Sequence, residues 1–134
     1  MMLSGVRDYI DTLGISENVY MGKLDAKKEK AVGVYNSRHN NTYKTALGGC
    51  ALKSYGAKYV TFLVHWNKSL SETEKASNDL FCALRETREI VINGAKIKFI
   101  QLLTDGPVDV GTDDAGIFEM VIEAAVIFEK GKGE

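Results

Sequence analysis

The chain has 134 residues and a formal net charge of −1, with 17 lysines and arginines against 18 aspartates and glutamates. This length is typical of one domain and buries a core without a disulfide or a metal, so we expect residues 1–134 to form a single domain. The 45% of hydrophobic and 26% of charged residues exclude a disordered protein. The near-neutral charge argues against specific nucleic-acid binding, which draws its affinity from lysine and arginine on phosphates.

Nothing in the sequence predicts export or membrane insertion. Arg7 and Asp8 come before any apolar run of signal-peptide length. The longest apolar stretch, residues 117–128, is interrupted by two glutamates and is shorter than the roughly 20 residues of a membrane helix. Cys50 and Cys82 lie 32 positions apart without a CxxC spacing, so we expect them to be reduced and buried in a protein made in the cytoplasm.

The first elements in chain order are a helix and two strands. Apolar residues at spacings of 3, 4 and 3 predict a helix that ends before Gly14; they are Leu3, Val6, Ile10 and Leu13. Two β-rich runs, residues 19–21 and 31–35, flank a polar stretch and are predicted to pair as an antiparallel hairpin. The polar, glycine-ended residues 36–49 predict a long loop, which leads to a strand near residues 50–53.

A strand and a helix follow. Apolar side chains alternate along residues 59–66, and the second face of this strand is only half polar, which predicts a central position in its sheet. A helix is expected from Ser71 to about Arg88. Its start fits a capping box in two registers, Ser69 with Glu72 and Ser71 with Glu74.

The remaining elements are strands. The Asn93-Gly94 dipeptide predicts a tight hairpin between residues 90–92 and 97–100, although it is also typical of a helix end. Residues 118–129 alternate with period two and are interpreted as a long strand, with a helix as the alternative. Together the elements predict an α+β fold, a mostly antiparallel sheet flanked by two helices.

Candidate chemistry is sparse. No phosphate-binding or nucleophile motif is present, so we expect no cofactor and no catalytic residue. Four aspartates crowd residues 105–116, but their order does not fit a calcium loop, and a solvated acidic loop is favoured. His65 is interpreted as a structural side chain and His39 as an exposed one.

Tyrosines alternate with lysines between residues 35 and 59. Such residues can stack on single-stranded bases, but tyrosine is also enriched on sheet surfaces and protein interfaces, and we favour that interpretation. The residues are Tyr35, Tyr43, Tyr55 and Tyr59 with Lys44, Lys53 and Lys58.

Charge is distributed unevenly along the chain. Residues 23–44 hold six basic and two acidic residues, a net charge of +4, whereas residues 101–129 hold seven acidic residues and no basic one, a net charge of −7. Most charge runs are solvated surface, but these two also suit a head-to-tail contact between identical subunits, which closes into a ring when the rotation allows it. The residues that we predict for this contact are Lys27, Lys28 and Lys30 against Asp113, Asp114 and Glu119.

Several stretches in a fixed order carry a family resemblance. They are residues 11–15 (DTLGI), 32–35 (VGVY), 46–49 (ALGG), 62–68 (FLVHWNK) with 72–74 (ETE), and 107–118 (PVDVGTDDAGIF) before the closing strand. Together they resemble the phage proteins known as minor capsid or tail-terminator-like proteins, and the resemblance covers nearly the whole chain.

The resemblance implies a virion assembly protein with an α+β fold and no catalytic residues. Similar proteins form a ring, often of six subunits, that caps the tail tube and joins it to the head. The implied partners are other copies of the chain and the tail-tube and head-connector proteins, in the host cytoplasm during assembly and then in the virion. The alternative function is a small-ligand-binding or enzymatic domain that uses the acidic residues 105–116.

Overall fold

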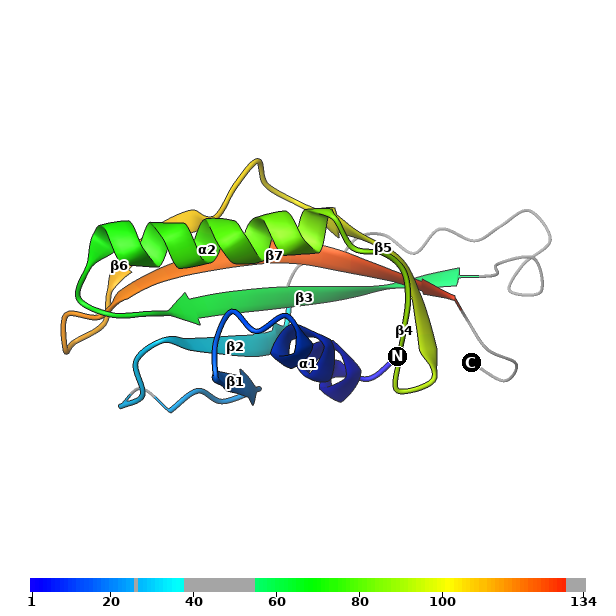
Figure 1. Cartoon of the computed structure of the whole chain (residues 1–134), viewed down its shortest axis with the longest axis horizontal. Helices are drawn as coiled ribbons and strands as arrows, with labels where there is room; N and C mark the ends of the chain where they lie inside the picture. Colours follow the sequence, from blue (N-terminus) through cyan, green and yellow to red (C-terminus); the bar gives the residue numbers. More distant parts are fainter. Residues whose placement is uncertain (26, 38–54, 130–134) are drawn as a thin grey trace.

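The computed structural model describes residues 1–25, 27–37 and 55–129, which form two helices and a sheet of seven strands (Figure 1). The elements are α1 Leu3–Thr12, β1 Asn18–Met21, β2 Ala31–Asn36, β3 Tyr55–His65, α2 Leu70–Arg85, β4 Arg88–Ile92, β5 Ala95–Leu102, β6 Val108–Thr112 and β7 Phe118–Glu129. The predicted α+β class is confirmed. The predicted strand at residues 50–53, most of the predicted loop, and the side chains of Arg38, His39, Tyr43, Lys44, Cys50 and Lys53 lie outside the described residues.

β3 and β7 form the centre of the sheet. The strand order is β1-β2-β3-β7-β5-β4, and β6 pairs with β7 beside this path. The pairing of β3 with β7 is antiparallel and runs from Tyr55 opposite Glu129 to His65 opposite Glu119. Their period-two patterns place alternate apolar side chains on one face, which is why both predicted strands, and the central position of the first, are confirmed.

The predicted antiparallel hairpin between the first two strands is wrong, because β1 and β2 are parallel. Asn18 lies opposite Ala31 and Met21 opposite Val34, so residues 22–30 must return along the length of β1. A two-residue hairpin joins antiparallel strands only, whereas nine residues separate β1 from β2. The sheet is therefore mixed, but every other strand pair in it is antiparallel, so the prediction of a mostly antiparallel sheet is confirmed.

In the second half of the chain, the capping and turn motifs predict the helix start and the hairpin correctly. Ser69 is the N-cap of α2 and accepts a hydrogen bond from the Glu72 N–H at 3.3 Å, so the first of the two capping registers is the one used. α2 ends at Arg85, earlier than predicted, because Arg88 already belongs to β4. The hairpin at Asn93-Gly94 is confirmed; both residues have positive φ, 49° and 80°, as a type I′ turn requires.

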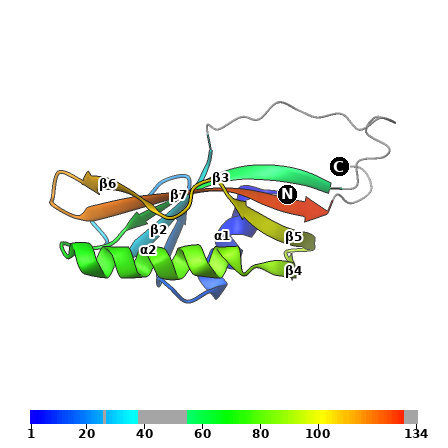
Figure 2. The same cartoon turned by 90° about the horizontal axis from the view of Figure 1, so that it is seen from above.

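Both helices contribute to one hydrophobic core on a single face of the sheet (Figure 2). α1 supplies Val6 and Ile10, and α2 supplies Leu80 and Leu84 among others. Cys82 is exposed on α2, so the prediction that it is buried is wrong; the core-facing positions beside it are Phe81 and Leu84. The sheet contributes Val32, Val34, Val60, Phe62, Val64, Ile97, Ile100, Ile122, Ala124 and Val126.

The sheet is curled, so that α1 lies between its outermost strands, β1 and β4 (Figure 1). The Arg7 side chain donates from Nε to the Val19 carbonyl of β1 at 3.2 Å. Asp8 accepts a hydrogen bond from the side chain of Asn93, in the β4–β5 turn, at 2.7 Å. One short helix therefore holds both ends of the strand path. Neither helix in the described ranges is long and apolar enough to span a membrane.

β6 is a strand that the sequence analysis missed. Residues 107–116 have the proline, glycines and aspartates of a turn, but residues 108–112 are extended and pair with the first half of β7. All five residues of β6 are exposed, so no hydrophobic alternation toward a core marks them.

Candidate functional site

One row of paired residues crosses the sheet where β3 ends and β7 begins. Asn18 of β1 lies opposite Ala31 of β2, which lies opposite His65 of β3. His65 lies opposite Glu119 of β7, and Glu119 lies opposite Gly111 of β6. Four strand spacings of about 4.8 Å make this row roughly 19 Å long. The predicted contact residues lie at or near the two ends of this row.

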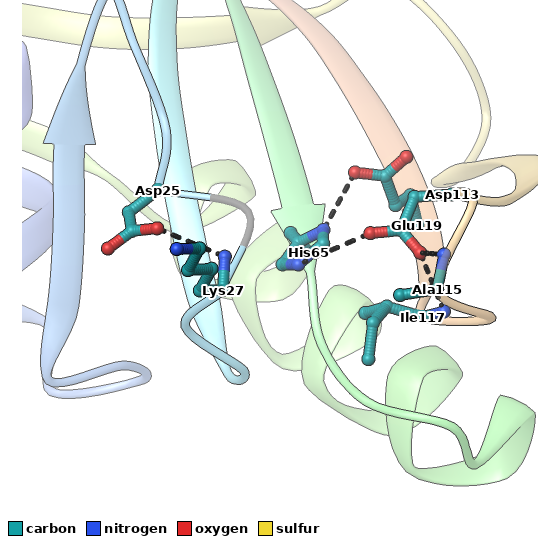
Figure 3. A network of polar contacts seen from close by, with 7 residues as sticks. All are labelled: Asp25, Lys27, His65, Asp113, Ala115, Ile117 and Glu119. Carbon is teal, nitrogen blue, oxygen red and sulfur yellow. Dashed lines mark hydrogen bonds and ion pairs between the residues drawn. The ribbon is translucent and has the colours of Figure 1, made fainter.

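His65 holds the middle of the row together. Its side chain is 1% exposed, with Nδ1 2.8 Å from Glu119 Oε2 and Nε2 3.8 Å from Asp113 Oδ2 (Figure 3). The imidazole therefore joins the end of β3 to the start of β7 and to the turn before it. We interpret this arrangement as a structural role for His65, as expected from the sequence.

Asp113 shapes the β6–β7 turn. Its Oδ1 accepts hydrogen bonds from the N–H groups of Ala115 and Ile117, each at 2.9 Å (Figure 3). The main chain of the turn also closes on Asp113, which donates its N–H to the Ile117 carbonyl at 2.9 Å. Because its two oxygens serve the turn and His65, this carboxylate is held in place within its own chain.

The three predicted acidic contact residues differ in accessibility. Asp114 is exposed at the tip of the turn. The side chains of Asp113 and Glu119 are each only 21% exposed and face His65. Asp105 and Asp109, which the contact prediction did not include, are exposed. The accessible acidic surface is therefore formed by the turn tip and β6 rather than by Glu119.

The basic side is exposed throughout. Lys27, Lys28 and Lys30 are all exposed and lie in the connection that leads into β2. Asp25 orders this connection, because its Oδ1 accepts from the Lys27 N–H and its carbonyl accepts from the Lys28 N–H, both at 3.0 Å. Lys30 donates its N–H to the Trp66 carbonyl at 2.6 Å, which anchors the connection next to the end of β3.

The basic and acidic sides lie apart in one chain. The connection that bears Lys27 is on the β2 side of His65, whereas Asp113 and the turn are on the β7 side (Figure 3). Among the ion pairs of the described residues, none joins the three lysines to Asp113, Asp114 or Glu119. Within the described residues, the two charged sides therefore form no ion pair with each other.

Tyr35 is a second residue near Glu119 that the contact prediction did not include. Burial raises the pKa of the Tyr35 phenol, and the Glu119 charge raises it further, while a hydrogen bond from the Leu24 backbone has the opposite effect. Tyr35 lies opposite Thr61 in the sheet, on the face that the helices leave uncovered. The alternation of apolar residues in β2 was the signal that could have placed the Tyr35 side chain on this face.

Residues 105–116, the segment of the alternative ligand-binding function, lie away from the hollow described below. Within the described ranges, no three histidine, cysteine or acidic side chains are grouped so that they could hold a metal ion. A hollow of about 570 Å³ lies at the opposite end of the sheet, between the start of α1 and the β4–β5 turn, and residues 105–116 do not line it.

A family model described as "Bacteriophage tail terminator protein" matches residues 4–130, which is nearly the whole chain. The chain is therefore a structural phage protein of the tail or head–tail region. It belongs to the bacteriophage tail terminator family, which confirms the predicted resemblance and associates the protein with the virion and with other phage tail or head proteins. No curated protein matches the sequence.

Proposed function

We propose that this protein completes the phage tail, at the tail terminus or the head–tail junction, as a closed ring of identical subunits. The family resemblance implies six copies. The ring assembles in the host cytoplasm and binds the tail-tube proteins on one side and the head-connector proteins on the other. Its role is structural, and the chain's own copies are its first partners.

The observation that supports the ring is the position of the two charged sides. The connection with the lysines borders β1 and β2, and the acidic turn borders β7 and β6, at opposite ends of one row across the sheet. Copies placed side by side would therefore bring the acidic side of one subunit to the basic side of the next. Such a contact is heterologous and closes into a ring when the rotation between copies allows it.

In this contact Lys27, Lys28 and Lys30 of one subunit face Asp113, Asp114 and Glu119 of the next. Asp114 is exposed and can pair directly with a lysine. Asp113 and Glu119 remain against His65 in their own chain and contribute negative potential rather than direct ion pairs. A contact of this kind weakens at high salt, because exposed charges are screened.

The test is light scattering after size-exclusion chromatography, at low and at high salt. We expect wild-type protein to form a closed oligomer whose stability falls as salt rises. The double variant K27E/K28E is expected to shift the protein toward monomer. The control K68E/K75E reverses two exposed lysines of the α2 region and is expected to assemble as the wild type does.

A mixing experiment gives the sharper result. K27E/K28E has two acidic sides, and a variant with Asp109 and Asp114 changed to lysine has two basic sides. Neither is expected to assemble alone, but an equal mixture should form alternating rings with an even number of subunits. Wild-type protein that stays monomeric at high concentration in both salts, or a mixture that stays monomeric although the wild type assembles, contradicts the proposal.

A further inference from the structure

β6 presents a strand edge that no other described strand covers. Its one neighbour among the described strands is β7. All of its residues are exposed, and two of them are apolar: Val108 is 45% and Val110 is 52% exposed. An edge strand with exposed valines and unpaired main-chain groups is a template for pairing with another chain.

The outermost strands β1 and β4 both pack against α1. β1 is bordered by α1, and its Val19 carbonyl already accepts the Arg7 side chain. β4 also packs against α1, and the turn after it is joined to Asp8 through Asn93. Natural sheets commonly cover their edges in this way, which prevents unwanted pairing. Within the described residues, neither helix packs against β6 in this way.

The main-chain groups that β6 points outward can be identified from β7. Phe118 donates its N–H to the Asn67 carbonyl at 2.8 Å, and its own carbonyl accepts from the Trp66 N–H at 3.1 Å, so its main-chain groups point toward the β3 side. The direction alternates from residue to residue along an antiparallel strand. Val121 therefore points its N–H and C=O toward β6.

Val121 lies opposite Val108, which places the main-chain groups of Val108 inside the hairpin. Its neighbour Asp109 then points its N–H and C=O to the free edge. The same alternation applies at the other end of β6. Asp113 donates its N–H inward, to the Ile117 carbonyl, so the N–H of Thr112 also points outward. β6 thus offers outward donors at two positions.

The negative charge beside β6 favours a partner with a basic surface. Asp105, Asp109 and Asp114 are exposed along or next to this edge. Two β6 edges that paired with each other would bring these carboxylates together, and like charges opposite one another destabilise a strand pair. The basic connection of a second copy, with Lys27 and Lys28, has the opposite charge and borders the other end of the same row.

We infer that the outer edge of β6 is the docking edge for a second copy of this chain, which binds it through main-chain hydrogen bonds to Asp109 and Thr112. The neighbour approaches with its basic connection, which bears Lys27 and Lys28, and Val108 and Val110 are buried in the contact. This inference rests on the proposed ring and specifies its acidic side: β6 makes the contact, while Asp113 and Glu119 support the turn behind it.

The experiment compares D109A with D109P. Both remove the carboxylate and its hydrogen bond to the Gly111 N–H, but proline also removes the outward N–H of residue 109. Proline is tolerated on an edge strand, so the two monomers should have the same melting temperature at high salt. We expect D109P to raise the dissociation constant of self-association about tenfold above that of D109A, the value of one hydrogen bond.

Hydrogen exchange in the wild type gives an independent measurement. The Thr112 amide should exchange quickly in the monomer and slowly in the oligomer, while the inward Val108 amide should be protected in both. If the oligomer forms but D109A and D109P associate equally and Thr112 exchange is unchanged, β6 is not the docking edge and the proposed ring stands. A wild-type dimer that forms no larger oligomer, and that is not weakened by K27E/K28E, would instead indicate that two β6 edges pair with each other. If no oligomer forms at all, both the ring and the docking edge are contradicted.

Discussion

Tyr35 shows how a single residue on the uncovered face is fixed by its surroundings. A Cβ added to Gly33 would lie 2.6 Å from Cε2 of Tyr35, so the phenol ring is folded against the glycine two positions before it. The ring shields a stretch of main chain that has no side chain of its own. Its hydroxyl is close enough to Leu24 and Glu119 for both to act on its ionisation.

The raised pKa of Tyr35 makes a pH-dependent prediction. The phenol ionises near pH 10.0 in the unfolded chain and only at higher pH in the folded one, so the folded state loses stability as pH rises through this interval. At pH 7, Y35F should be less stable by about 1 kcal/mol, because the hydrogen bond from Leu24 is lost. That gap should narrow as pH rises above 10.0, since phenylalanine has no proton to lose.

Urea unfolding at several pH values measures the gap, and the difference in phenolate absorbance between wild type and Y35F reports the titration of Tyr35 itself. A gap that stays constant up to alkaline pH, or a difference spectrum that titrates below pH 10.0, would contradict the assigned environment.

For single residues, the sequence indicated which side chains are charged or buried, but not which side chains they contact. It predicted that His65 is at least partly buried, and the side chain is 1% exposed. Its partners, Asp113 and Glu119, could not be predicted, because they depend on the register between β3 and β7. The same register turned two of the predicted intersubunit acids inward.

The start of α2 shows the same dependence at the scale of an element. The Ser69 hydroxyl accepts the Glu72 N–H, as in a capping box, but the Glu72 carboxylate accepts from the side-chain amide of Asn67 at 3.0 Å. Asn67 in turn accepts the Ser69 N–H at 2.9 Å through Oδ1. Three side chains, those of Asn67, Ser69 and Glu72, therefore make the hydrogen bonds at this helix start, whereas the simple capping box uses two.

This arrangement distinguishes two serines that look alike in sequence. S69A should lower the free energy of unfolding by about 1 kcal/mol, because the N-cap bond is lost. S71A, the matched control inside the first turn, should change it by less than about 0.5 kcal/mol. Urea unfolding of both variants is the measurement. Equal losses would mean that Ser71 also caps the helix.

The alternation of apolar residues predicted where strands occur, but not whether neighbouring strands run parallel or antiparallel. The apolar pattern identified β3, β5 and β7 correctly, since each buries one face. The same pattern is compatible with parallel and antiparallel neighbours, so it could not show that β1 runs parallel to β2. β6 has no buried face at all, and its proline and aspartates resemble a turn.

For the whole molecule, α1 is the link between the two ends of the curled sheet. It packs against β1, β2 and β4, and its Ile10 side chain is 1% exposed. Removing the side chain at this position should therefore loosen strands that are far apart in the sheet order.

We expect I10A to lower the free energy of unfolding by about 3 kcal/mol, as is usual for a large-to-small change in a core. Hydrogen exchange should become faster in β1 and β4 together, while β3 and β7 remain the slowest strands. D11A, at an exposed position of the same helix, is the control. Faster exchange in β1 without β4 would show that α1 does not couple the two outer strands.

The separation of charge was visible in the sequence, but its meaning at the scale of the molecule was not. Segments of +4 and −7 could have met within one subunit. The connection with Lys27, Lys28 and Lys30 and the acidic turn lie on opposite sides of His65, because β7, which follows that turn, pairs with β3 and not with β2. The strand order is therefore what keeps the two charged sides apart within one subunit.

That strand order also has a consequence for synthesis. β7 is the last described strand along the chain, yet it lies in the middle of the sheet and pairs with β3, β5 and β6. A ribosome-bound chain that has not yet released residues 118–129 has no centre on which to assemble its sheet, and these distant pairings form slowly. Unfinished chains therefore lack the folded flanks on which a ring would depend, and only chains that contain β7 can take a place in the tail.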